Sequence, residues 1–596
     1  MSFRALTVWA LVAATALSWA VPACAPRAAK AAAPPASPPQ AAAPAPPQKP
    51  GPLPGEQLLQ PQQMLADLRH ISATIQEVHP ALADRAARAG FAARAQALEA
   101  QLQRPQPAWR FFALANGLVN SLEDAHTHLW VPDAGGMLPI RLTWAEDGAV
   151  VTGVLDPTLP VRAGDQLVSL GGRSPEQLLA ALDGWIPHGN PYWVKALAGQ
   201  YLTNTLVLQG LGLVSAPDPL QPETVQPETV QIVVRRRPPA AEAGAAAALI
   251  TAEVPVWSGL TVVQTLPITD LAGRSVSPAA EAGLRPGDHI LKMGGEPVAS
   301  LADFSRLLQQ YGREDRPIPL EILRHGRRMT VNLRPAATRA PGTPPESQPV
   351  YKAGVAFGSN PAPERPWFGW TVNREAGYGL FWLDQCNDTR EYRRAVDQFF
   401  AAVRKEGIPR IAIDLRRNGG GNSMVVRAFL KYLPYKSLRA GSGWTRPSAQ
   451  LTQQRSFWLR ALAFLSQTFF NGRWFPYPIQ PRAPADQLFR GQVVVLTSWK
   501  TFSAAVDFAA MLSDNHLATL AGAPTGGTPS EYGDILNFTT PNTGWSFSVS
   551  TTRFVRPDPA RDPADALYPD VPIATTVRDL QEGRDAVVEW LRQNAE

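Results

Sequence analysis

The stretch Gly491–Ala510, GQVVVLTSWKTFSAAVDFAA, joins a short apolar run to a second apolar segment through a polar turn. The run Val493 to Leu496 is rich in valine and predicts a buried strand, and the segment from about Ala504 predicts a helix. Ser503 therefore stands where a strand gives way to a helix, and unpaired N–H groups and the helix dipole favour negative charge there. An ordinary serine N-cap occupies the same kind of position, so Ser503 alone does not decide the function.

The segments before this stretch repeat the same alternation of strand and helix. Tyr378 to Leu383 and Ile411 to Leu415 read as strands, with helices near Arg393 to Lys405 and from about Ser423. This order predicts a mixed α/β fold with a largely parallel sheet covered by helices. The Pro-rich stretch Pro335 to Pro349 precedes it, so we expect a separate core over residues 350–596.

Three further segments carry polar and glycine-rich patterns. Asp414 to Ser423 (DLRRNGGGNS) places three glycines at a strand end, where backbone N–H groups can approach a ligand closely. No lysine follows as in a P-loop, which disfavours phosphate binding. Gly522 to Pro529 (GAPTGGTP) follows Ser503 by about twenty residues, and Asp124-Ala125-His126-Thr127 lies far upstream.

Together and in this order, the four segments resemble the motifs of the C-terminal-processing and tricorn-type serine peptidases. The resemblance covers roughly residues 65 to 595 and implies a crotonase-like catalytic core with Ser503 as nucleophile. One branch of the family uses a Lys after the Ser, but Thr528 stands at that position and no Lys follows Lys500. The other branch uses a His that His126 matches, and an imidazole with a pKa near 6.5 can accept a proton at neutral pH.

The resemblance also implies the remaining members of the site. Asp562 fits the carboxylate that orients the His, with Asp565 behind it, although other members carry Glu there. His128, on the opposite face if this segment is extended, and Lys500 are the alternative bases. Ala125 and Ala504 replace a Ser and an Asp of the tricorn pattern, so a relay of four side chains is in doubt. The oxyanion hole is expected from backbone N–H groups, those of Ala504 with Gly419 or Gly420.

Two stretches resemble each other, Arg162 to Gly172 and Arg285 to Gly295, each with a Gly-Asp turn, a short apolar strand and a Gly-Gly turn. The second lies in a β-rich segment that resembles a PDZ domain, over residues 251–336, with Ser258-Gly259-Leu260 as its carboxylate-binding loop. PDZ domains take a peptide with a free C-terminus as an added strand. The alternative is a module that packs between domains without a ligand.

The N-terminus reads as an export signal. Residues 1–24 have an early Arg4, an apolar run and small residues near Cys24. Val21-Pro22-Ala23-Cys24 resembles a lipobox, in which Cys24 would be acylated, but Pro22 departs from it and simple cleavage is the alternative. Residues 25–61 form an Ala/Pro-rich spacer that we expect to be disordered, and residues 62–250 form an α+β region that carries the His segment.

Composition narrows the function further. The chain has 596 residues, a net charge of +6 and two cysteines, with no basic surface for nucleic acid. His126-Thr127-His128 lacks a third ligand at recognisable spacing, so neither a metal nor another cofactor is implied. We therefore expect a serine endopeptidase of the periplasm or cell envelope. A lipid on Cys24 would anchor it to the membrane, unless the signal is simply cleaved. The alternatives are an inactive peptide-binding envelope protein, or a lipase or esterase, for which Ser503 lacks the Gly-x-Ser-x-Gly elbow.

Overall fold

The structure is a computed structural model. It describes residues 57–132, 136–214, 229–238, 247–258, 260–298, 301–314, 316–324, 327–339, 348–357, 365–454, 473–474 and 483–594. The signal, Cys24, most of the spacer and Gly259 lie outside these residues.

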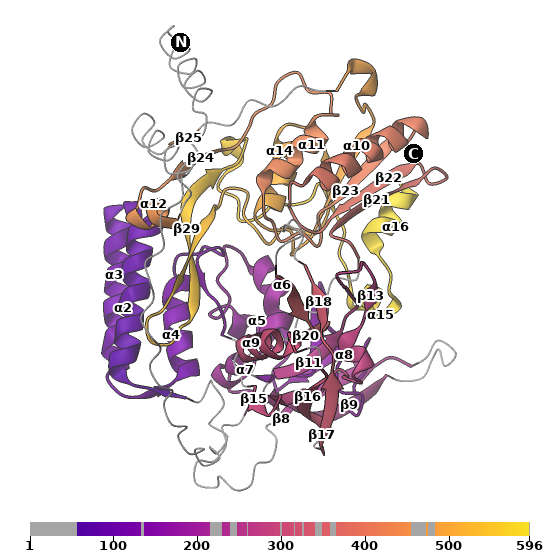
Figure 1. Ribbon diagram of the computed structural model, residues 1–596. Coiled ribbons are helices and arrows are strands. Elements are labelled where there is room, and N and C mark those ends of the chain that lie inside the picture. Colours follow the sequence, from indigo (N-terminus) through magenta and orange to yellow (C-terminus); the bar gives the residue numbers. More distant parts are fainter. Residues whose placement is uncertain are drawn as a thin grey trace, which may run out of the picture. The chain divides into compact units, whose positions relative to one another are not determined.

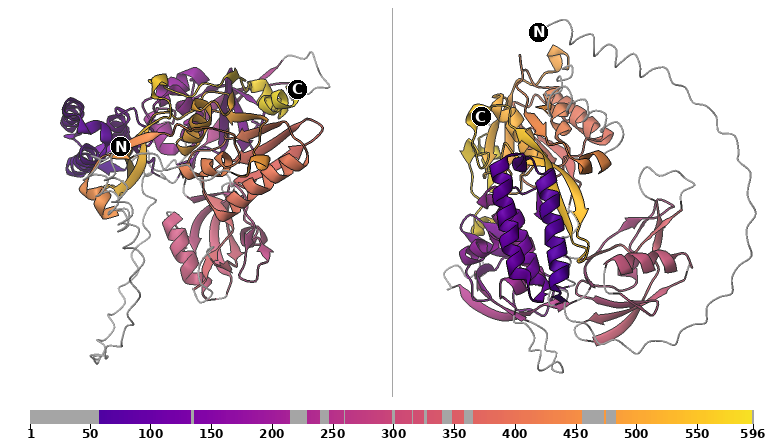
Figure 2. Two further views of the ribbon diagram at one scale, coloured as in Figure 1. Left: turned by 90° about the horizontal axis from the view of Figure 1, so that it is seen from above. Right: turned by 90° about the vertical axis from the view of Figure 1, so that its left-hand side faces the viewer.

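The described chain begins with a helical segment. Helix α2 (Pro61–Val78) buries Met64, Leu68, Ile71 and Ile75, whose spacing of three and four residues places them on one face. In Figure 2, α2 lies alongside α3 (Arg85–Glu99), and α4 (Ala108–Asn120) follows. The buried carboxylate of Asp67 accepts the backbone N–H groups of Asn542 and Thr543, which fastens α2 to a β-hairpin far along the chain.

The C-terminal core contains a six-stranded sheet of order β21-β22-β23-β26-β27-β30. The pairs from β22 to β30 are parallel and β21 is antiparallel to β22. The strands are β21 (Phe368–Asn373), β22 (Tyr378–Leu383), β23 (Arg410–Asp414), β26 (Gln492–Thr497), β27 (Thr519–Gly522) and β30 (Val571–Pro572). The mixed α/β class expected from the sequence is confirmed.

Helices cover both faces of this sheet. The face with Ile411, Ile413 and Val495 packs against α10 (Arg390–Lys405), α11 (Val426–Leu430) and α14 (Ala504–Asp514), which Figure 1 shows close together. The other face carries Ala412 and Val494 and packs against α16 (Ala586–Gln593). Burial on both faces explains why these strands are apolar without alternation.

A second sheet brings the upstream His segment to the core. Its order is β25-β24-β29-β28, from β25 (Arg473–Trp474), β24 (Ser442–Thr445), β29 (Ser546–Val555) and β28 (Tyr532–Thr539). Strand β3 (His128–Leu129) pairs with β29, with His128 opposite Ser548. This pairing holds the residues just before it, including His126, beside the late segments of the chain.

The two look-alike stretches lie in two sheets, which we call the first and second Gly-Asp sheets, and four strands follow one another in chain order in each, β6-β7-β8-β9 and β11-β14-β16-β17. The first is β5-β6-β7-β8-β9 and the second is β20-β11-β14-β16-β17. The first consists of β5 (Ile140–Ala145), β6 (Gly148–Val154), β7 (Gln166–Leu170), β8 (Thr229–Arg236) and β9 (Ala248–Pro255). The second consists of β11 (Leu260–Thr265), β14 (His289–Met293), β16 (Ile318–Arg324), β17 (Arg327–Leu333) and β20 (Val355–Phe357).

The same ion pair fastens each Gly-Asp turn. Asp165 receives two hydrogen bonds from Arg236, at 2.8 and 2.6 Å, and Asp288 receives two from Arg324, at 2.6 and 2.7 Å. In both sheets the Asp is almost fully buried and a valine of the neighbouring strand donates its N–H to the carbonyl of that Asp. Bidentate Arg–carboxylate pairs of this kind stabilise the turn and also hold the two side chains in a defined geometry. The resemblance between the stretches therefore extends to both sheets.

The second Gly-Asp sheet continues beyond residue 336, where the sequence predicted its end. Strand β20 pairs antiparallel with β11, with Val355 opposite Thr265 and Ala356 opposite Gln264. Because β14 lies on the other side of β11, both edges of β11 are paired. Strand β10 (Trp257–Ser258), which includes part of the expected carboxylate-binding loop, pairs with β4 (Gly136–Met137).

Candidate active site

Ser503 has an unusual backbone conformation at the turn between β26 and α14. Its φ is 53° and ψ is −130°, a region that non-glycine residues rarely adopt. Although Ser503 precedes the first residue of α14, its side chain makes no capping hydrogen bond. The ordinary N-cap interpretation therefore does not account for this serine. The N–H of Phe502 donates to the carbonyl of Asn418 at 3.0 Å, which ties this turn to the glycine-rich loop.

Glycines leave room for the serine on two sides. A Cβ at Gly420, whose φ is 104°, would lie 2.6 Å from Cβ of Ser503 and 3.1 Å from its Oγ. A Cβ at Gly527 would lie 3.1 Å from the backbone N of Ser503. The glycine-rich loop and the GAPTGGTP segment thus both pack against Ser503, and side chains at these glycines would crowd it.

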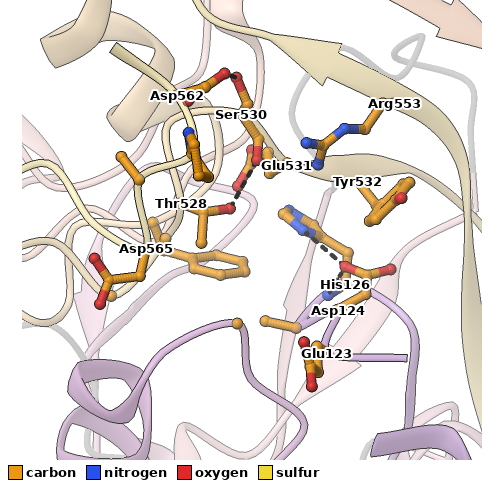
Figure 3. Close-up of a pocket in the computed structure, with 17 residues that line it drawn as sticks. Glu123, Asp124, His126, Thr528, Ser530, Glu531, Tyr532, Arg553, Asp562 and Asp565 are labelled. Atoms are coloured by element: carbon orange, nitrogen blue, oxygen red, sulfur yellow. Dashed lines mark hydrogen bonds and ion pairs between the residues drawn. The ribbon is translucent and has the colours of Figure 1, made fainter. Parts of the chain in front are cut away.

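His126 lies next to this turn, with its ring stacked on Phe502 at 4.5 Å between centroids. Trp193 stacks on the same Phe502 ring at 4.1 Å. The Nε2 atom of His126 is buried and has no hydrogen-bond partner among the described residues. Figure 3 shows the ring extending into the middle of the site, below the guanidinium of Arg553. The His126 ring therefore keeps one nitrogen available for a proton transfer.

The carboxylate beside His126 is that of Asp124. Oδ1 of Asp124 accepts the backbone N–H of His126 at 2.9 Å and lies 3.8 Å from Nδ1 of the same residue. Oδ2 accepts the hydroxyl of Ser550 at 2.6 Å and lies 3.1 Å from Nε2 of His79. Nδ1 of His79 accepts the N–H of Ala81, so Nε2 is the nitrogen that donates to Asp124. A buried network thus holds Asp124 against His126.

The electrostatics of this network follow from burial and charge. Burial lowers the pKa of His126, and the charge of Asp124 partly opposes that shift. Burial acts to raise the pKa of Asp124, but the hydrogen bond from His79, the positive charges that His79 and His126 carry when protonated, and the Ser550 hydroxyl together hold it well below its usual range. Asp124 is therefore ionised and His126 neutral near neutral pH, as a general base requires.

A cavity of about 490 Å³ opens beside His126. Its wall includes His126, Phe502, Thr528, Asp562 and Asp565 (Figure 3). Ser503 is not among the lining residues, and it makes no hydrogen bond with His126 within the described chain. Catalytic hydrogen bonds are often long before substrate binds. Thr528, at the position where the other branch has its Lys, lines the same cavity and donates to the carbonyl of Ser530.

The two late carboxylates, Asp562 and Asp565, lie on the cavity wall but form no hydrogen bond or ion pair with His126 among the described residues. Asp562 accepts the hydroxyl of Ser530, and its Oδ1 is buried without a partner. Asp565 is exposed and accepts the hydroxyl of Tyr568 at 3.2 Å. The sequence placed Asp562 in the role of orienting carboxylate, which stays a prediction, and the carboxylate that lies 3.8 Å from Nδ1 of His126 is that of Asp124. Sequence reasoning did not assign Asp124 a role, although it stands two residues before His126.

The expected oxyanion donors differ in their availability. The N–H of Gly420 donates to Oδ1 of Asn418 at 2.8 Å and is therefore already engaged. The N–H groups of Gly419 and Ala504 make no hydrogen bond within the described residues. This leaves the N–H groups of Gly419 and Ala504 as the unoccupied pair, and the oxyanion role of Gly419, Gly420 and Ala504 stays a prediction.

The alternative bases lie elsewhere. His128 packs against Trp130 at 3.8 Å between ring centroids, and burial lowers its pKa to about 4. Lys500 is exposed, and neither residue lines the cavity. Within the part of the chain that the structure describes, no group of three metal-ligating side chains occurs and no helix is long and apolar enough to cross a membrane.

A serine on a strained turn, a buried histidine with a free ring nitrogen and free backbone donors are the features of a serine-peptidase type of site. Residues 379–573 match the family model of peptidase family S41, and residues 272–324 match that of the PDZ domain. The chain therefore carries an S41 peptidase domain together with a PDZ domain, as the resemblance implied. The residues matched to the PDZ domain include β14 and β16 of the second Gly-Asp sheet.

Solved structures of mature CPAF share the fold. Mature CPAF has 14% sequence identity and a TM-score of 0.50, covering 90% of this chain and 96% of that one. Mature CPAF complexed with lactacystin has 14% identity and a TM-score of 0.51, covering 90% of this chain and 98% of that one. At this identity the likeness concerns the fold alone.

Curated relatives match over shorter stretches. A protein named as a zinc metalloprotease of Neisseria meningitidis is 32% identical over 102 residues, which are 17% of this chain and 21% of that protein. A protein named as the serine protease HhoA of Synechocystis is 32% identical over 88 residues, which are 15% of this chain and 20% of that protein. The chain thus spans about a fifth of the length of these relatives, and their names differ in mechanism.

Proposed function

We propose that this chain is a serine endopeptidase that cleaves peptide bonds through an acyl-enzyme. The observation that carries the proposal is the free Nε2 of His126 in the cavity, on a ring that packs against the neighbour of Ser503. A histidine with one nitrogen facing a carboxylate and the other unpaired is arranged to act as a general base. The S41 match supports the same activity.

The mechanism follows from these positions. Ser503 attacks the scissile carbonyl while His126 accepts its proton, and the N–H groups of Ala504 and Gly419 stabilise the oxyanion. His126 then returns the proton to the leaving amine, and water hydrolyses the acyl-enzyme. Asp124 orients the imidazole and stabilises its protonated form. Asp562, which shares the cavity, remains the alternative orienting carboxylate once substrate reshapes the site.

The test is labelling of the purified protein with a fluorophosphonate probe, followed by mapping of the labelled peptide. We expect the label on Ser503 and its loss in Ser503→Ala. Because a CPAF structure holds lactacystin, competition by lactacystin gives a second readout. A protein that neither reacts with the probe nor cleaves unfolded protein substrates would favour the inactive peptide-binding alternative.

The cellular setting is also part of the proposal. The apolar segment before Cys24 and the Ala/Pro-rich spacer support export to the periplasm or cell envelope, with Cys24 as the site of a lipid anchor. The substrates would then be proteins or peptides of that compartment. The PDZ domain would take a free C-terminus as an added strand, provided that β20 leaves β11, whose edges are both paired.

A further inference from the structure

The cavity beside His126 is acidic. Five carboxyl groups and one guanidinium line it, those of Glu123, Asp124, Glu531, Asp562, Asp565 and Arg553. The guanidinium of Arg553 donates to the carbonyl of Ser530 at 3.1 Å and lies 4.7 Å from the ring centroid of Tyr532. It forms no ion pair with a lining carboxylate among the described residues. A concave site lined mainly by carboxyl groups favours the binding of cations.

Glu531 differs from the other lining carboxyl groups. It is 6% exposed, yet its carboxyl makes no hydrogen bond or ion pair within the described part of the chain. Asp124 is equally buried but has several donors, and Asp565 is exposed to water. A buried carboxyl without a partner costs free energy, and a cation in the cavity would offset that cost.

The position of Glu531 is fixed by its surroundings. Its carbonyl accepts the N–H of Phe554 at 2.7 Å, and its neighbours Ser530 and Tyr532 contact Asp562 and His79. Burial and the charges of Asp507 and Asp124 raise the pKa of Glu531 well above its usual range, and Arg553 opposes them. Asp507 follows Ser503 by one turn of α14 and Asp124 adjoins His126, so Glu531 lies within electrostatic reach of both catalytic segments.

We propose that Glu531 is a specificity-determining residue that accepts the Lys or Arg side chain of a substrate residue next to the scissile bond. The inference rests on the proposed peptidase function. A bound ammonium or guanidinium group would favour the ionised carboxyl, so the proton of Glu531 passes to solvent when substrate binds. A neutral side chain of the same length would leave the carboxyl unpaired.

The test uses the full-length protein and pairs of fluorogenic peptides that differ by Lys or norleucine at one position on either side of the scissile bond. Norleucine keeps the four-carbon stem of the Lys side chain and lacks its ammonium group. At one position we expect kcat/KM for Lys to exceed that for norleucine by at least about tenfold. Glu531→Gln should bring this ratio close to one, and Glu531→Asp should leave an intermediate ratio. The matched control Glu375→Gln, exposed in the turn between β21 and β22, should retain the wild-type ratio.

The outcomes separate the inference from the function on which it rests. Cleavage with no preference for Lys at any position, in a protein labelled at Ser503, would overturn the role of Glu531 and leave the peptidase intact. A Lys preference that survives in folded Glu531→Gln would assign the preference to another residue. If the wild type neither cleaves nor reacts with the probe, the peptidase function itself fails. The ratio of kcat/KM for Lys to kcat/KM for norleucine is measured on the wild type alone. The inference can therefore still be overturned if Glu531→Gln does not fold.

Discussion

Oδ1 of Asp124 both accepts the backbone N–H of His126, at 2.9 Å, and lies 3.8 Å from Nδ1 of the same imidazole. A single carboxylate oxygen thus restrains the histidine through its main chain and faces its ring. The network behind it, from His79 and Ser550, is buried and restrains the Asp124 carboxylate through hydrogen bonds to its Oδ2. Residues of the N-terminal region and of β29 therefore orient His126. Among the described residues, the late segment that holds Asp562 takes no part in this network.

Asp124→Asn should lower kcat by about 100-fold, because the amide no longer stabilises a protonated His126. KM should change by less than about threefold, since the cavity keeps its shape. Steady-state kinetics with one peptide measure both. The control Ser550→Ala removes one donor to Asp124 and should lower kcat by less than about tenfold. If Asp562→Ala abolishes turnover while Asp124→Asn is nearly as active as wild type, Asp562 is the orienting carboxylate.

The acid limb of the pH profile of kcat/KM should lie at a lower pH than the pKa of an exposed imidazole, which is about 6.5. Burial lowers the pKa of His126, and the base is active when neutral, so kcat/KM rises with pH through this pKa and then levels off. Asp124→Asn removes a charge that raises the pKa, so its limb should shift further toward acid. His128→Gln should leave the limb unchanged. A limb that stays in place in His126→Gln would show that another group is the base.

The features that could be predicted from the sequence are those that depend on residues close together in the chain. Alternating strands and helices follow from periodicity, and Ser503 and His126 follow from short motifs. The role of Asp124 depends on His79 and Ser550, which are distant in sequence and meet only in the fold. The pairing of β20 with β11 joins residues about 90 positions apart, and no local signal indicates it. The Gly-Asp turns were visible, but the matching Arg236 and Arg324 were not assigned because they lie on other strands.

Ser503→Gly should be more stable than Ser503→Ala by about 1 kcal/mol, because glycine adopts a φ of 53° without the strain of a side chain. Ser503→Ala should lie within about 0.5 kcal/mol of wild type, since the Ser503 hydroxyl makes no capping bond that could be lost. Urea unfolding measures both values. Both variants should lose the fluorophosphonate label. Equal stability of the two variants would mean that residue 503 is not strained.

The signal segment gives a prediction about anchoring. The wild type should fractionate with membranes and carry a diacylglyceryl group on Cys24, and Cys24→Ser should move it to the soluble fraction. Mass spectrometry of the N-terminal peptide and fractionation after high-salt washing measure this. A soluble wild type that begins at Ala25 or Pro26 would show simple signal cleavage instead.

The paired edges of β11 lead to the last prediction. Since β20 lies on the edge of β11 opposite β14, the amide hydrogens of Val263 to Thr265 should exchange slowly in the intact protein. Ala356→Pro should release this edge, because proline lacks the N–H that a ladder uses and is disfavoured within sheets. Hydrogen exchange followed by mass spectrometry should then show at least about tenfold faster exchange in β11. Strand β6, which β5 covers in the first Gly-Asp sheet, is the internal control and should not change. Fast exchange of β11 in the wild type would mean that β20 leaves this edge readily, and that a peptide with a free C-terminus meets an open PDZ strand without having to displace it.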